Sequence, residues 1–284
     1  MSVMRARAVV RRAQGPFLLP ARIVLLIAGL IAVALGTFIV LHEYHAGQVD
    51  RLYLIIALIA GLVWLACIGL GFQGYRIGVF GAAAIAFVQF GVLASNHFVS
   101  GPGALGTFVR HEGLPIATAA MALVPACATV IMSAAVCWTN PRARNPRLET
   151  VAVLLASIAG AAFVILQATD GVHRIDFGTA NTEDGAFAAA IVASLWLAGG
   201  LWIARVRRTG ALLIAVATFI VCYSFVTLHL FQGGTSLQEI ASKSGVIWVW
   251  ISGAATVLAA ASFVVALTLL VLSVLRPRRE KRLS

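Results

Sequence analysis

Apolar residues occur along this chain in eight long runs, without the 3.6-residue polar stripe of a soluble amphipathic helix. Each run approaches or exceeds the roughly 20 residues that a helix needs to cross a bilayer core about 30 Å thick. Because helices satisfy every backbone hydrogen bond within a lipid-facing run, the pattern predicts an all-α fold, a polytopic transmembrane helical bundle. The predicted spans are 22–42, 52–72, 78–98, 115–138, 149–168, 186–204, 211–231 and 246–275.

The connections between spans are short, so the chain divides into a basic segment 1–21, one transmembrane domain 22–275 and a basic tail 276–284. A weak internal repeat predicts four helical hairpins, because odd-numbered spans begin at an arginine and mostly end at a histidine. A cytoplasmic arginine at the start of these spans is also what the positive-inside rule alone would give. The evidence for the repeat therefore rests mainly on the histidines. The starts are Arg22, Arg76, Arg147 and Arg208, and the histidine ends are His42, His97 and His229.

Composition narrows the class of protein further. Hydrophobic residues make up 61% of the chain and charged residues 11%. Soluble domains usually have about 45–50% apolar and about 25% charged residues. An ordinary soluble enzyme is therefore excluded, and so is a disordered chain, which needs low hydrophobicity.

The charges predict the orientation in the membrane. If the N-terminus is cytoplasmic, seventeen of the 21 Lys and Arg residues lie on the inner side, and eight of the ten acidic residues lie outside. The positive-inside rule therefore predicts that both termini are cytoplasmic, in a multi-pass protein of the plasma or inner membrane. The basic patches at helix ends favour contact with anionic lipids of the cytoplasmic face, in addition to the bilayer itself, over binding of nucleic acid.

All six histidines fall on the predicted outer side. Three of them end helices at a similar depth, and His42 and His45 share one face of a continuing helix. Neutral imidazole is the commonest metal ligand, so this pattern indicates a site for copper, zinc or haem iron. The alternative is that the histidines are amphipathic interface residues, since their spacing matches no defined zinc or haem motif. The candidate metal ligands are His42, His45, His97 and His229.

Two other classes of function stay open. Polar residues around Pro125 favour a permease for a neutral or lipidic solute, whereas outer carboxylates favour an enzyme that acts on a lipid-linked substrate. The permease residues are Gln89, Thr118, Thr129 and Thr218, and the carboxylates are Glu43, Glu112 and Asp170. Asp170 is expected in a long polar outer loop that ends at Gly185. No motif places a nucleophile, and no charged residue lies near the middle of a span, which disfavours a proton relay.

These observations favour a multi-spanning membrane protein that acts through its outer face. The expected role is metal or haem handling, or that of an accessory subunit in a membrane complex. The four cysteines all lie within predicted spans, so no disulfide framework is expected in the outer loops.

Overall fold

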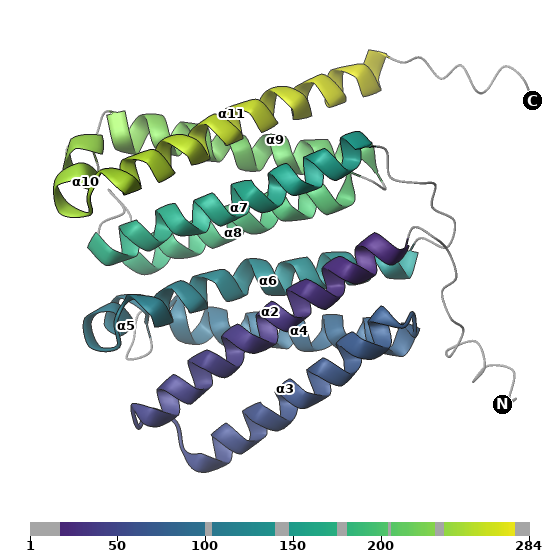
Figure 1. The fold of residues 1–284 in the computed structure, drawn as a ribbon, viewed down its shortest axis with the longest axis vertical. Coiled ribbons are helices and arrows are strands. Elements are labelled where there is room, and N and C mark those ends of the chain that lie inside the picture. Colours follow the sequence, from purple (N-terminus) through teal and green to yellow (C-terminus); the bar gives the residue numbers. More distant parts are fainter. Residues whose placement is uncertain are drawn as a thin grey trace, which may run out of the picture.

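The protein folds into an assembly of helices, seen in a computed structural model that describes residues 18–99, 104–139, 148–174, 181–203, 206–230 and 236–275. These residues contain no strand, and eight of their helices are long and apolar enough to cross a membrane. The prediction of an all-α transmembrane bundle is confirmed. The elements are α2 (Leu18–His45), α3 (Arg51–Phe72), α4 (Arg76–His97), α5 (Leu105–His111), α6 (Leu114–Thr139), α7 (Leu148–Arg174), α8 (Thr182–Trp202), α9 (Arg207–Ser224), the π-helix η1 (Phe225–Leu230), α10 (Leu237–Lys243) and α11 (Val246–Leu275) (Figure 1).

The fifth span differs from the prediction. The sequence pattern ends this span at 168 and places a loop from Asp170 to Gly185, but α7 continues to Arg174 and α8 already begins at Thr182. The helix continues because Asp170 and Arg174 are one turn apart and form an ion pair, which stabilises polar residues in helical conformation. At the other end Asn181 caps α8 by accepting a hydrogen bond from the backbone N–H of Asp184. Of the predicted terminal segments, 1–17 and 276–284 lie outside the described residues.

The eight long helices form two sets of four with the same packing order. In the first half α2 packs on α3, α3 on α4, α4 on α6, and α6 returns to α2. In the second half α7, α8, α9 and α11 close in the same way, with α11 returning to α7. The halves meet through α6, which packs against α7 and α8, and Figure 1 shows them as two adjacent groups. The four-hairpin repeat itself stays a prediction.

The two halves also share several residues at a constant spacing in sequence. Each contains a seven-residue helix, α5 or α10, directly before its last span. Each of these helices is followed by a glycine with positive φ, Gly113 at 88° and Gly245 at 95°. Four side-chain pairs have the same separation in sequence as these two glycines, so the correspondence runs through several consecutive helices. The pairs are Trp64 and Trp196, Arg76 and Arg208, Phe87 and Phe219, and His97 and His229.

Corresponding glycines allow the second and third helix of each half to touch through their backbones. A Cβ atom on Gly78 would lie 2.4 Å from the backbone N of Gly71. A Cβ atom on Gly210 would likewise lie 2.4 Å from the backbone N of Ile203. Backbone atoms cannot move aside as a side chain can, so these positions accept only glycine. Small residues at such crossings are the usual means of helix association in lipid.

We expect Gly210→Ala to destabilise the protein, because overpacking of a tight contact costs about 1–3 kcal/mol. Gly253→Ala is the matched control, since it is also helical and a Cβ atom there meets nothing within 4 Å. At that position alanine favours the helix by up to about 1 kcal/mol. Thermal unfolding of the purified variants in detergent measures both effects. Equal melting temperatures for the two variants would contradict the close approach.

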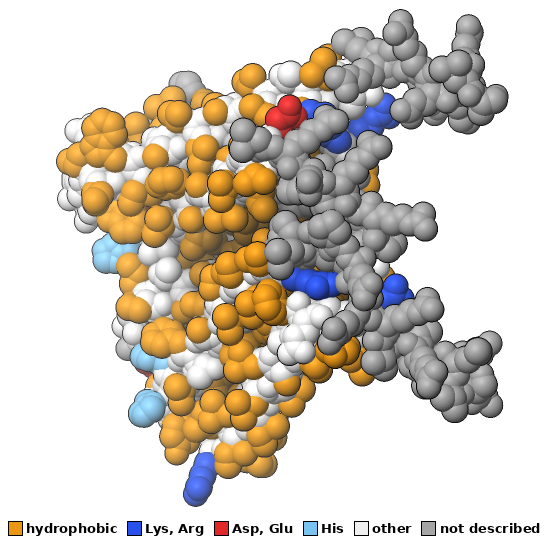
Figure 2. Space-filling view, turned by 45° about the vertical axis from the view of Figure 1, so that its right-hand side comes forward, with side chains coloured by type: hydrophobic (Ala, Val, Ile, Leu, Met, Phe, Trp, Pro, Cys, Tyr) orange, Lys and Arg blue, Asp and Glu red, His pale blue; other side chains and the backbone are white. Residues whose placement is uncertain are grey.

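The described histidines gather at one end of the bundle, whereas the described arginines are divided between the two ends. Figure 2 shows the visible histidines along one edge, whereas most of the visible Lys and Arg side chains lie toward the opposite edge. We call these ends the histidine face, where α2, α4 and α7 end, and the arginine face, where α4 and α9 begin. At the arginine face Arg76 lies 5.5 Å from the ring centroid of Trp138, and Arg207 lies 3.5 Å from Glu149.

Candidate functional site

The first half carries a polar network at its histidine face. His42, near the end of α2, places Nε2 at 2.7 Å from Oε2 of Glu112, the residue that follows α5. The other carboxylate oxygen of Glu112 accepts a hydrogen bond from Nε2 of Gln48 at 3.1 Å. Two segments that are distant in sequence, the end of α2 and the end of α5, are thus joined by one carboxylate.

A second imidazole and carboxylate lie beside this pair. Nε2 of His97, the last residue of α4, is 3.7 Å from Oε1 of Glu43. The His97 ring is buried and packs on Phe108 of α5, with 4.8 Å between ring centroids. Glu43 follows His42 directly, and consecutive helical residues point in different directions, so α2 contacts α4 and the end of α5 at once. We call His42, Glu43, His97 and Glu112 the outer network.

The charge balance of the outer network is unusual for partly buried acids. The side chains of Glu43 and Glu112 are 14% and 17% exposed. Among the described residues neither carboxylate pairs with Lys or Arg, and the partner of each in an ion pair is an imidazole. With neutral imidazoles the network carries two uncompensated negative charges. Carboxylates in such surroundings attract a proton or a metal cation.

The other two candidate metal ligands do not join this network. Nδ1 of His45 donates to the carbonyl of Leu41 on its own helix at 2.6 Å, and the residue is exposed. His229 is buried in the second half, where its Nε2 lies 2.8 Å from Nε2 of Gln167. No group of three or more His, Cys, Asp or Glu side chains able to hold a metal ion occurs within the described ranges. The four histidines predicted as ligands are therefore divided between two halves, and only His42 and His97 enter one network.

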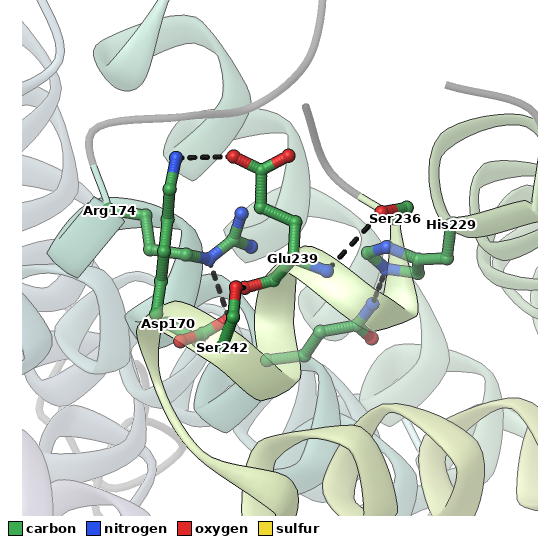
Figure 3. Close-up of polar contacts among 8 residues, drawn as sticks. Asp170, Arg174, His229, Ser236, Glu239 and Ser242 are labelled. Atoms are coloured by element: carbon green, nitrogen blue, oxygen red, sulfur yellow. Dashed lines mark hydrogen bonds and ion pairs between the residues drawn. The ribbon is translucent and has the colours of Figure 1, made fainter. Parts of the chain in front are cut away.

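In the second half the buried acid, Asp170, pairs with an arginine and not with an imidazole. Asp170 and Arg174 of α7 form an ion pair with 3.0 Å between Oδ2 and Nε, and their side chains are 3% and 4% exposed. Oδ1 of Asp170 has no hydrogen-bond partner in the described structure. Figure 3 shows this pair near α10, where Glu239 pairs with Lys243 at 2.5 Å and its backbone N–H donates to Ser236. The four-residue spacing of Asp170 and Arg174 was the sequence signal for this pair.

The acids that would serve an enzyme on lipid-linked substrates are dispersed. Glu43 and Glu112 both belong to the outer network, whereas Asp170 is bound to Arg174 in the other half. A site that combines all three carboxylates is therefore not formed.

The hydroxyls expected to line a permease path bond within their own helices. Thr118 donates to the carbonyl of Leu114 at 2.9 Å, Thr129 to that of Pro125 at 2.7 Å, and Thr218 to that of Ile214 at 2.7 Å. Because Pro125 lacks a backbone N–H, it frees a carbonyl one turn earlier, yet α6 continues through it as one helix. These bonds favour a structural role for the three threonines.

Compared with protein-family models, curated proteins and solved structures, the chain matches none of them. The function proposed here therefore rests on the geometry and the chemistry of the outer network.

We expect Asp170→Ala to be strongly destabilising, because it removes one partner of a buried ion pair, a loss of about 3–5 kcal/mol. The double variant Asp170→Leu, Arg174→Leu removes both charges and should recover much of this loss. Glu149→Ala, which removes an exposed ion pair from the same helix, should cost less than about 1 kcal/mol. Thermal unfolding in detergent ranks the variants. A double variant less stable than Asp170→Ala would show that the pair is not the source of the effect.

Proposed function

We propose that this chain is a multi-pass membrane protein that binds a divalent transition-metal ion at its histidine face, through the outer network. In this proposal the histidine face is the outer side of the plasma or inner membrane, and the arginine face contacts anionic cytoplasmic lipids. The observation that carries the proposal is that two partly buried carboxylates, Glu43 and Glu112, have imidazoles as their ionic partners and no Lys or Arg within the described part of the chain.

The donor atoms select the kind of cation. The outer network offers two imidazole nitrogens and two carboxylates, a set that suits Zn²⁺ or Cu²⁺. Calcium and magnesium prefer oxygen ligands throughout. A haem iron held by an opposed pair of imidazoles receives less support, because His229 bonds Gln167 in the other half.

In the free protein the donors satisfy one another instead of surrounding a common point. An incoming ion would replace the hydrogen bond between His42 and Glu112, and it would draw His97 and Glu43 toward the same position. The side chain of His42 is 33% exposed, so it can turn without disrupting a packed core. Such a site would serve metal acquisition or delivery at the membrane surface, alone or as the accessory subunit of a membrane complex.

We expect the purified protein to bind one equivalent of Zn²⁺, measured by metal analysis after gel filtration in detergent and by titration calorimetry. His97→Ala and Glu112→Gln each remove a donor and should weaken binding by at least about tenfold, since even supporting residues of metal sites affect affinity by about 10–100-fold. His173→Ala is the matched control, because His173 is exposed at the same face, outside the outer network.

Folded protein that binds neither Zn²⁺ nor Cu²⁺ would overturn the proposed function. Equal losses in His97→Ala and His173→Ala would point to non-specific surface binding and would overturn it as well.

The proposed orientation is tested separately by labelling intact cells with a membrane-impermeant maleimide. A cysteine at Asp184, exposed on the histidine face, should react from outside. A cysteine at Glu149, whose side chain is 70% exposed on the arginine face, should react only after permeabilisation. The parent chain, whose four cysteines lie within the helices, gives the background. The reverse pattern would place the outer network in the cytoplasm.

A further inference from the structure

The short helix α5 connects the two halves of the protein across the histidine face. Its C-terminal end leads into Glu112, which contacts His42 of the first half. Its N-terminal end reaches the second half, where the backbone N–H of Gly106 donates to Oε1 of Glu183 on α8 at 3.1 Å. Between these contacts Leu105 and Phe108 are fully buried, so the helix is held at both ends and along its apolar side.

The contact with Glu183 is close enough to constrain α5. A Cβ atom on Gly106 would lie 2.8 Å from the same carboxylate oxygen, so the first turn of α5 and the end of the Glu183 side chain are in close contact. The position of α5 in turn sets the position of Phe108, which packs on His97, and of Glu112, which contacts His42. A carboxylate in the second half thus supports two members of the outer network in the first half.

We propose that Glu183 is a positioning residue for the cation site, an inference that rests on the proposed function. Glu183 binds no ion itself, because its contact runs to the backbone of α5. By holding the first turn of α5 it fixes Glu112 and Phe108 against the imidazoles. The metal affinity of the first half therefore depends on a residue of the second half.

The corresponding helix α10 provides an internal reference. It has the same length as α5, and the N–H groups of Ser244 and Gly245 bond the carbonyl of Ile240, just as those of Glu112 and Gly113 bond that of Phe108. The polar contacts of Glu239 stay within α10 and its cap, to Ser236 and Lys243. Loss of Glu183 should therefore loosen α5 and leave α10 unchanged.

The experiment compares Glu183→Ala, Glu183→Gln and Asp184→Ala in the full-length protein. Asp184 is exposed in the same first turn of α8, so Asp184→Ala removes the same favourable charge from the helix N-terminus without touching α5. Glu183→Gln keeps an oxygen that can accept from Gly106. Two quantities are measured, the dissociation constant for Zn²⁺ and the hydrogen exchange of α5 and α10 amides without metal.

We expect Glu183→Ala to weaken Zn²⁺ binding by about tenfold and to speed exchange in α5 but not in α10. Glu183→Gln should stay within about twofold of the parent chain, and Asp184→Ala should change neither quantity. Equal effects of Glu183→Ala and Asp184→Ala, or unchanged exchange in α5, would overturn the positioning role. A parent protein without Zn²⁺ binding would overturn the proposed function, while the exchange measurement would still test the hold of Glu183 on α5.

Discussion

The cost of placing a charge in lipid governs where this protein can have chemistry. An ionised side chain at the centre of a membrane helix costs about 2.5–3.5 kcal/mol by insertion measurements. The described charged residues accordingly lie near helix ends or in the connections between helices. The interior consists of packed apolar side chains and of hydroxyls that donate to backbone carbonyls of their own helix, such as those of Thr129 and Thr218. Any site that binds a charged ligand must therefore be built at one of the two faces.

The two halves compensate buried acids at the histidine face in different ways. In the second half Arg174 pairs with the buried Asp170, and Lys243 pairs with Glu239, whose side chain is 27% exposed. In the first half the partners of the acids are imidazoles, whose neutral form has a lone pair that can bind a metal ion. A guanidinium has no such lone pair to offer. The two halves thus share a packing order but differ in the counter-charge of their acids, and this difference is what supports the cation site proposed for the first half.

Hydrophobic run length predicted all eight spans, because crossing a bilayer sets a minimum length that the sequence shows directly. The same criterion ended the fifth span too early. There the ion pair between Asp170 and Arg174, one turn apart, keeps polar residues helical beyond the apolar run. The positions of the histidines near helix ends predicted that they share one end of the bundle, but position along a helix gives depth and says nothing about lateral neighbours. Which side of the membrane this end faces stays a prediction. His229 is as deep as its counterpart His97 by this reasoning, yet it belongs to the other half. The partnership of Glu112 with His42 depends on how α5 folds back, which no periodicity shows.

The π-helix η1 gives a physical reason for the different partners of His97 and His229. Both histidines occupy the same place in the plan of their halves, at the end of the third span. In α4 the helix is regular up to His97, which lies beside Glu43 of α2. After α9 the chain continues as η1, Phe225–Leu230, whose wider turns change the direction of the side chains. His229 then lies against the neutral amide of Gln167 on α7. A change in the winding of one helix end thus gives two corresponding histidines different neighbours among the described residues, a carboxylate for His97 and an amide for His229.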